Sequence, residues 1–153
     1  MPQPLMRRAQ VADSEDIGRL VAEAYAHYPA RIGARPAPMD ADQAREIVEK
    51  EVWVCPPEGE IQGVLVLRQE PTELWVDNLA VGPKAAGSGV ARALLDHATV
   101  RGKARGAREL RLLTHELMTE NRALYDHLGW EQIETPPYER MSRVYFRKRI
   151  ESP

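Results

Sequence analysis

The chain has 153 residues, of which 43% are hydrophobic and 29% are charged, and its net charge is −2. This length and composition favour one globular domain spanning residues 1–153, and the charge gives no basic field for nucleic acid. The single cysteine, Cys55, excludes an intrachain disulfide, and no apolar run approaches the roughly 20 residues that cross a membrane, so we expect a cytoplasmic protein without a membrane partner.

The N-terminal part of the chain predicts a short strand, a helix and a loop. Leu5 to Gln10 is expected to form the strand, and Asp13 is expected to cap a helix over Ser14 to His27. Apolar residues repeat at helical spacing along this helix: Ile17, Leu20, Val21, Ala24 and Tyr28. Three prolines and a glycine then predict a loop from Pro29, which ends the helix, to Met39.

A second helix and three strands follow this loop. Asp40 is expected to cap a helix over Ala41 to Lys50, and Val52 to Cys55 reads as a strand. The continuous apolar run in Ile61 to Leu67 is typical of a central strand that is covered on both faces. A Pro-Thr turn then leads into the strand Leu74 to Val81, which we expect to pair with it as an antiparallel hairpin.

The stretch V-D-N-L-A-V-G-P-K-A-A-G-S-G-V-A-R-A-L-L, Val76 to Leu95, reads as a strand, a glycine turn and a helix that runs to about Arg105. A helix that begins on a glycine turn directs free N–H groups and its positive dipole end at the turn, where phosphate is the usual ligand. Gly87 and Gly89 are otherwise plain turn residues. A dinucleotide fold is the other alternative, but Arg92 stands where that motif has its third glycine.

The remaining chain predicts three strands and one helix. Glu109 to Thr114 is a strand, about Glu120 to Leu128 is a helix that Gly129 ends, and Trp130 to Thr135 and Val144 to Ile150 are closing strands. The resulting order is β-α-α-β-β-β-α-β-α-β-β. Because strands and helices do not alternate strictly, this order indicates a mixed α+β fold.

A second motif, N-x-x-A-L-Y-x-x-L-G-W, occupies Asn121 to Trp130. Together with V-D-N-L-A-V-x-P…G-x-G-V-A-x-A-L-L, it resembles the GNAT superfamily of acyl-CoA-dependent N-acyltransferases. GNAT domains share the element order given above, so the resemblance implies a mixed, mostly antiparallel sheet of about seven strands with about four helices. The chain departs from the family pattern at Ala86, where Arg or Gln is usual, although Lys84 places a charge nearby.

The resemblance implies acetyl-CoA as co-substrate and direct transfer of its acetyl group to a primary amine in a ternary complex. The glycine turn and helix start would hold the pyrophosphate, and the pantetheine arm would lie between Leu74–Val81 and Glu109–Thr114, two parallel strands that splay apart. Backbone groups of the first strand would pair with that arm and polarise the thioester carbonyl. The implied cofactor-binding residues are Leu79, Ala80, Val81, Gly87, Ser88, Gly89, Val90, Ala91 and Asn121.

Two side chains are candidates for the proton transfers. Tyr125 matches the tyrosine that the family places near the CoA sulfur, where a phenol can act as general acid; core packing is its alternative role. Asp77 is the candidate base, expected on the face of Trp75 and Leu79, where apolar neighbours would raise the pKa of its carboxyl; an ordinary ion pair is the alternative. His115 is expected near the acyl end. No pair of histidines has metal-ligand spacing with a carboxylate, so we expect no metal.

Acceptor specificity in this fold tends to come from the first two helices, their connecting loop and the last strands. The corresponding residues are Tyr25, Tyr28, Arg31, Arg35, Met39 and Tyr138. The two arginines suggest a carboxylate or phosphate on the acceptor, or are solvated loop charges. The acceptor is expected to be a small-molecule amine or a peptide, and family members are often homodimers. The rival functions are a non-catalytic acyl-CoA-binding module and a nucleotide-binding or structural domain.

Overall fold

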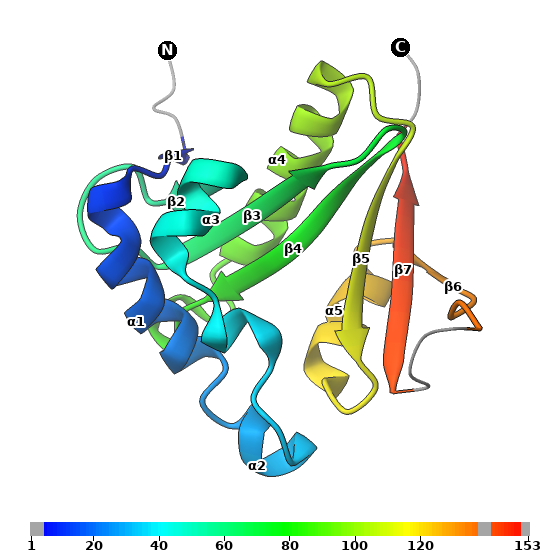
Figure 1. Ribbon diagram of the computed structural model, residues 1–153, viewed down its shortest axis with the longest axis horizontal. Coiled ribbons are helices and arrows are strands. Elements are labelled where there is room, and N and C mark those ends of the chain that lie inside the picture. The colour runs from blue at the N-terminus through cyan, green and yellow to red at the C-terminus, as the bar shows by residue number, and fades with distance from the viewer. Residues whose placement is uncertain (1–4, 138–141, 151–153) are drawn as a thin grey trace.

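The computed structural model describes residues 5–137 and 142–150, which form a seven-stranded sheet with helices on both faces (Figure 1). The strands are β1 (Arg7–Arg8), β2 (Glu51–Cys55), β3 (Gly63–Gln69), β4 (Glu73–Val81), β5 (Glu109–His115), β6 (Glu131–Ile133) and β7 (Arg143–Arg149). The helices are α1 (Ser14–Ala24), α2 (Tyr28–Ile32), α3 (Gln43–Glu49), α4 (Val90–Ala104) and α5 (Thr119–His127). Among these residues, no helix combines the length and the apolar composition needed to cross a bilayer.

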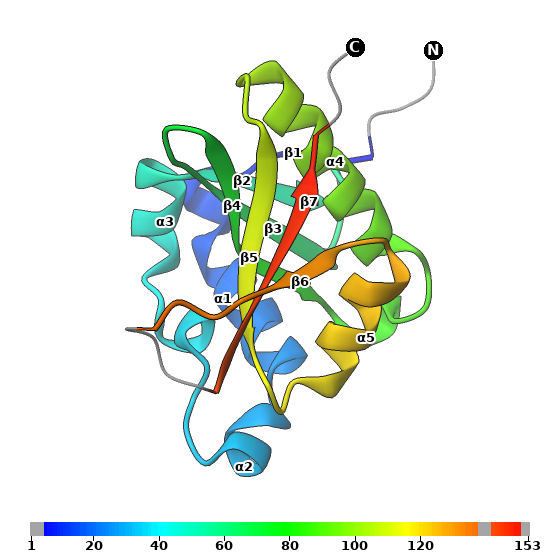
Figure 2. The same ribbon diagram turned by 90° about the vertical axis from the view of Figure 1, so that its right-hand side faces the viewer.

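The strands lie in the order β1-β2-β3-β4-β5-β7-β6, and each neighbouring pair is antiparallel except β4 and β5. Helices α1 and α3 cover one face of the sheet and α4 and α5 cover the other (Figure 2). The α+β class and the β3–β4 hairpin are therefore confirmed. Residues Gly63 to Leu67 are buried throughout, which confirms that β3 is covered on both faces.

Alternate residues of the central strands supply a separate apolar core on each face. Val64 and Val66 pack with the α1 face, whereas Leu65 and Leu67 pack with the α4 face. The α1-face core contains Ile17, Leu20, Val21, Tyr25, Tyr28, Val52, Val54, Ile61, Val64, Val66, Ala80 and Met118. This division follows from the two-residue period of a strand, which directs successive side chains to opposite faces.

A β-bulge in β4 changes which face its side chains point to. The register pairs Val66 with Asn78 and Leu67 with Val76, so Asp77 is the extra residue between two pairs. Before the bulge, Val76 packs into the core on the α4 face; after it, Ala80 packs into the core on the α1 face. Even-numbered residues therefore point to the α4 face before Asp77 and to the α1 face after it. The alternation of buried residues continues unbroken along β4, so it does not reveal the change.

The parallel strands β4 and β5 separate soon after they begin. They pair only from Glu73 to Trp75, opposite Glu109 to Arg111 (Figure 1). Beyond this point β5 is paired with β7 on its other side, and β4 remains paired with β3. The sheet therefore opens into a V between two strands that are each still held by an outer neighbour, as the resemblance implied.

Three local predictions about the N-terminal region are wrong. The segment 29–39, expected to be a loop, contains most of α2, and the preceding helix ends at Ala24. Pro29 lies in the first turn of α2, where its missing N–H has no intrahelical acceptor to lose. The Asp42 carboxylate, not that of Asp40, caps the next helix by accepting from the Arg45 N–H at 3.2 Å. Asp13 does occupy the N-cap position of α1, as predicted, but its carboxylate accepts from the Gln10 N–H at 2.7 Å and makes no capping hydrogen bond to the helix.

A buried carboxylate ties β2 to the C-terminal end of α4. The Glu51 side chain is 3% exposed and accepts hydrogen bonds from Arg101 Nε at 2.6 Å, Trp53 Nε1 at 2.8 Å and Arg105 Nε at 3.0 Å. Burial by itself would raise the pKa of the Glu51 carboxyl, but these donors outweigh it and lower the pKa to about 2. The carboxylate therefore holds a helix against the sheet at an edge remote from the opening.

We predict that Glu51→Gln lowers the free energy of unfolding by about 1–3 kcal/mol at pH 7, because it removes charge-assisted hydrogen bonds from a buried group. Since the folded pKa lies below the unfolded value, the stabilisation is complete above about pH 4.5 and is lost as the pH falls toward 2. Urea denaturation at several pH values measures the difference.

The matched control is Glu131→Gln, which breaks an exposed pair with Arg147. It should change the unfolding free energy by less than about 1 kcal/mol. Equal effects of the two substitutions, or a Glu51→Gln effect that stays constant down to pH 2, would contradict this account of Glu51.

Candidate active site

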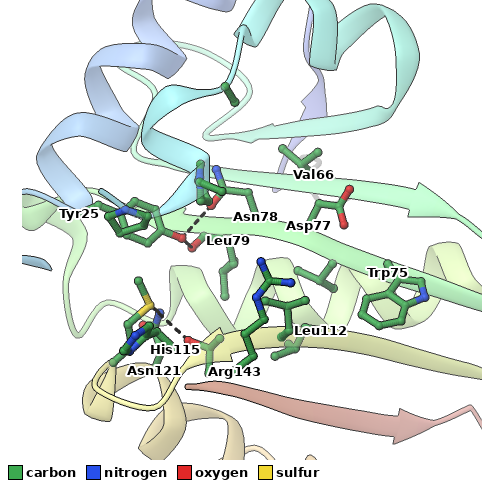
Figure 3. A pocket seen from close by; sticks show the side chains of 18 of the residues that line it. Tyr25, Val66, Trp75, Asp77, Asn78, Leu79, Leu112, His115, Asn121 and Arg143 are labelled. Carbon is green, nitrogen blue, oxygen red and sulfur yellow. Dashed lines mark hydrogen bonds between the residues drawn. The ribbon is translucent and has the colours of Figure 1, made fainter. Parts of the chain in front are cut away.

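A cavity of about 860 Å³ lies where β4 and β5 separate. Its walls come from the diverging strands, the segment between α2 and α3, and the start of β7, as Figure 3 shows. A smaller hollow of about 130 Å³ shares Tyr25, Leu79 and Asn121 with it and extends toward Ala91 at the start of α4. The two hollows together form a path from the glycine turn to the middle of the opening.

The glycine turn before α4 has the geometry of an anion site. Gly87 and Gly89 have φ values of +78° and +89°, the left-handed region that glycine adopts at least cost. Helix α4 begins at Val90, and the hydrogen bond from Ala93 N to Gly89 O, 3.0 Å long, is the first of its ladder. The N–H groups before Ala93 therefore have no intrahelical acceptor and point out of the helix start, which fits a phosphate. Ala86 is exposed beside them.

The far part of β4 presents unpaired backbone to the opening. Gly82 N donates to Gln62 O of the preceding turn at 2.8 Å, so the even-numbered residues here bond toward β3. Because antiparallel ladders alternate, Leu79 and Val81 direct their N–H and C=O groups to the other edge, from which β5 has diverged. The Tyr25 hydroxyl, 3.2 Å from Leu79 O, lies at that edge. An extended, amide-containing chain would fit there like an added strand.

Tyr125 of α5 faces the cavity from the α4 side of the sheet. The residue is 5% exposed, and its ring contacts Trp130 and Phe146 at centroid distances of 5.8 and 5.5 Å. Burial, with a smaller contribution from Tyr28, raises the pKa of the hydroxyl, so Tyr125 is a neutral phenol that can donate a proton. None of the residues that the structure describes hydrogen bonds to this hydroxyl. The ring of Tyr125 thus packs in the core, while its hydroxyl has no hydrogen-bond acceptor among the described residues and can donate to a ligand.

The environment expected for Asp77 is wrong. The carboxylate is 2.9 Å from Lys50 Nζ of the α3 C-cap and 2.9 Å from Arg68 Nε of β3, so it lies in an ion-pair network rather than among apolar side chains. The bulge at Asp77 also turns Leu79 toward the opposite face. Asp77 still lines the cavity, as Figure 3 shows, with its oxygens held by two cations. Asp77 therefore forms ion pairs, which was the alternative to an apolar environment.

Two of the acceptor candidates join α2 to α5. The Tyr28 hydroxyl donates to Glu120 Oε2 at 3.0 Å, and Arg31 Nη1 is 2.7 Å from the same oxygen. Burial and the hydrogen bond to Glu120 raise the pKa of Tyr28 to about 12, whereas the hydrogen bond from Arg31 lowers the pKa of Glu120 to about 2. Arg31 therefore has an internal carboxylate partner. We use the name α2–α5 clasp for Tyr28, Arg31 and Glu120.

The other acceptor candidates differ in whether they line the cavity. Tyr25 lines the cavity, and burial raises the pKa of its hydroxyl. Arg35 also lines the cavity, but its Nε pairs with Asp40 at 2.8 Å. Met39 packs against the α1-face core, and Tyr138 lies outside the described residues. Each of the two arginines, Arg31 and Arg35, thus has a carboxylate of the chain beside it.

Several cavity residues were missed by sequence reasoning. Glu46 and Lys50 of the α3 region and Arg68 of β3 line the wall beside Asp77, and Arg143 of β7 reaches between the diverging strands (Figure 3). No local pattern marks them, because their importance comes from contacts across the sheet. Within residues 5–137 and 142–150, no cluster of three or more His, Cys, Asp or Glu residues is arranged to hold a metal ion.

We predict that Gly89→Ala destabilises the protein by about 1 kcal/mol, because a side chain at φ +89° is strained even though no atom lies within 4 Å of the added Cβ. Gly18→Ala in α1 is the control: its Cβ would meet Gln43 Cγ at 3.9 Å, and we expect a gain of about 0.5–1 kcal/mol. Urea denaturation of both variants measures these changes. Tolerance of Gly89→Ala without loss would mean that the turn adopts another conformation.

Comparisons with known proteins agree with this architecture. A family model described as acetyltransferase (GNAT) family matches residues 18–130. A relative from Escherichia coli strain K12, described as "Uncharacterized N-acetyltransferase YjgM", is 27% identical over 140 residues, which cover 86% of this chain and 84% of the relative.

Two solved structures share the fold. The PaiA N-acetyltransferase of Thermoplasma acidophilum, solved in complex with coenzyme A, superposes with a TM-score of 0.80 at 17% identity and covers 94% of this chain and 97% of its own. The ribosomal-protein-S18-alanine N-acetyltransferase of Escherichia coli has a TM-score of 0.75 at 17% identity, with 97% and 94% covered. At such identities the likeness concerns the fold.

Proposed function

The chain belongs to the acetyltransferase (GNAT) family, and from this premise we propose that it transfers the acetyl group of acetyl-CoA directly to a primary amine within a ternary complex. The observation that carries the proposal is the opening between β4 and β5, which joins a glycine turn at one end to a buried neutral phenol in the middle. Acetyl-CoA would supply an activated acyl group on a thiol leaving group.

The residues of the chain fit acetyl-CoA in two places. The N–H groups of Gly87, Gly89, Val90 and Ala91 would bind the pyrophosphate, whereas Ser88 N already donates to Ala85 O at 3.1 Å within the turn. The backbone from Leu79 to Val81 would pair with the pantetheine arm, and an N–H of this edge would polarise the thioester carbonyl. Asn121, which lines both hollows, would contact the arm from α5.

Two side chains would manage the protons while the amine nitrogen bonds to the acyl carbon and the carbon–sulfur bond breaks. The Tyr125 hydroxyl would donate its proton to the departing sulfur, a role supported by its burial and its open hydrogen-bonding capacity. Asp77 would take up the proton that the amine loses, directly or through water, with Lys50 and Arg68 fixing the position of the carboxylate. Asp77 lines the same cavity from β4, whereas Tyr125 lines it from α5.

We expect Tyr125→Phe to lower kcat by about 100-fold or more, because a general acid typically contributes that much, while the Kd for acetyl-CoA changes little. Steady-state assay of CoA release, paired with calorimetric titration of each variant, separates these effects. A kcat equal to that of the unsubstituted protein would remove Tyr125 from the proton transfer.

Calorimetric titration with acetyl-CoA tests the cofactor, and NADH serves as the control ligand. We expect micromolar binding of acetyl-CoA alone, and about tenfold tighter binding after Ala86→Arg, because an exposed arginine beside the turn adds a charge-assisted hydrogen bond to phosphate. Binding without turnover over a broad amine panel would favour a non-catalytic acyl-CoA module. Absence of binding would contradict the proposed function at its first step.

A further inference from the structure

Resting on the proposed function, we infer that Asn78 selects the acceptor, and that the acceptor is an α-amino carbonyl compound whose oxygen receives a hydrogen bond from the Asn78 side-chain amide. Such a compound is an amino acid, its amide or the amino terminus of a peptide. The three share one chemistry: a primary amine two carbon atoms away from a carbonyl oxygen.

Asn78 is a buried polar residue whose amide is held in one orientation. The residue is 8% exposed and lines the cavity immediately after the bulge in β4. The hydroxyl of Tyr25, itself buried, lies 2.8 Å from Asn78 Oδ1 and 3.2 Å from Leu79 O, and the shorter distance assigns its single hydrogen to Asn78 Oδ1 (Figure 3). Because the oxygen is engaged, the amide presents its Nδ2 hydrogens elsewhere, and none of the described residues accepts from them.

This amide donor lies on a cavity wall without a protein acceptor, so a ligand that displaces water from it must accept its hydrogen bond or leave it unsatisfied. The ligand must offer an oxygen or another hydrogen-bond acceptor to Nδ2. An apolar amine could not satisfy this group and would leave it desolvated. The requirement concerns the acceptor rather than the acyl donor, because Asn78 lies on the wall shared with Asp77 and Val66, beyond the β4 edge where the pantetheine arm would lie.

The other polar groups of the cavity favour the same ligand. His115 Nδ1 accepts from Leu117 N at 3.1 Å, so a neutral imidazole carries its hydrogen on Nε2 and is a donor there. The carboxylate of Asp77, in contrast, is already engaged by two cations. Asn78 Nδ2 and His115 Nε2 are therefore two donors on the cavity wall that a carbonyl oxygen can satisfy.

Anchoring at Asn78 also fits the reaction geometry. Asn78 directly precedes Leu79, whose backbone faces the open edge of β4 at the proposed thioester site. In an α-amino carbonyl unit the oxygen and the amine are close neighbours, so a hydrogen bond from Nδ2 would hold the amine beside that edge. Positioning of this kind lowers the barrier because the reacting atoms are brought together before the reaction.

The test compares acceptors with the same side chain that carry or lack a carboxamide group on the α-carbon. Glycinamide, alaninamide, leucinamide and phenylalaninamide are paired with methylamine, ethylamine, isoamylamine and 2-phenylethylamine, and CoA release is measured with acetyl-CoA. An α-amino group loses its ammonium proton about 2 pH units below an alkylamine, so kcat/KM is calculated on the free-amine concentration, and on that basis we expect the unsubstituted protein to favour the amides by at least about tenfold. Asn78→Leu should lower kcat/KM for the amides by about 10- to 100-fold and change that for the matched amines by less than about threefold.

Tyr25→Phe provides a second variant that retains Asn78. It removes the hydroxyl that fixes the amide, so we expect a smaller loss, about three- to tenfold, again confined to the amides. If Asn78→Leu does not fold, this variant decides the question. Calorimetry with acetyl-CoA and the melting temperature of each variant provide the controls. Leucine and leucyl-glycine, compared with leucinamide, then distinguish a free amino acid from a peptide terminus as the source of the carbonyl.

Equal kcat/KM values for amides and matched amines, or an Asn78→Leu loss that is the same for both, would overturn the assignment of Asn78 while leaving the proposed function intact. Turnover of the simple amines without turnover of any amide would do the same. Release of no CoA with any amine, although acetyl-CoA binds, would instead overturn the proposed function and the assignment with it.

Discussion

The separation of β4 from β5 is the constraint on which the rest of the molecule depends. Parallel strands that stop pairing inside a domain leave backbone N–H and C=O groups without partners, which is costly unless water or a ligand reaches them. Here the two strands pair over Glu73–Trp75 and then diverge, and the bulge at Asp77 accompanies the divergence. The exposed edge of β4 is therefore both an unsatisfied feature of the fold and the natural place for an extended ligand.

The helices and charges around the opening keep it in shape. On the α1 face, Lys50 joins the C-terminal end of α3 to Asp77 in β4. The α2–α5 clasp connects the two walls at the end where α5 begins. These contacts place charged groups as supports beside the cavity, so a charged residue that lines it need not touch the acceptor.

The family relationship and the site carry different parts of the functional argument. The GNAT family and the shared fold account for the glycine turn, the open β4 edge and an acyl-CoA co-substrate. Neighbours with about the same fold have identities near 17%, so the acceptor must be argued from the side chains of this chain. The hydrogen-bonding geometry of Asn78, Tyr25 and His115 supports the proposed acceptor.

The sequence by itself determined the features that depend on neighbouring residues: the amphipathic α1, the apolar β3, the glycines that turn the chain before α4, and the position of Tyr125 on α5. Helical and strand periods and left-handed glycine positions are local properties, so they can be read along the chain. The tertiary structure alone decided that Asp77 is a bulge residue with two cationic partners, that Arg31 forms an ion pair with Glu120, and that Pro29 lies in the first turn of a helix rather than ending one. The pairs Lys50–Asp77 and Arg31–Glu120 join residues that are distant in sequence, and Arg68 meets Asp77 across the β3–β4 hairpin, so helix packing and strand register rather than a local pattern bring these charges together.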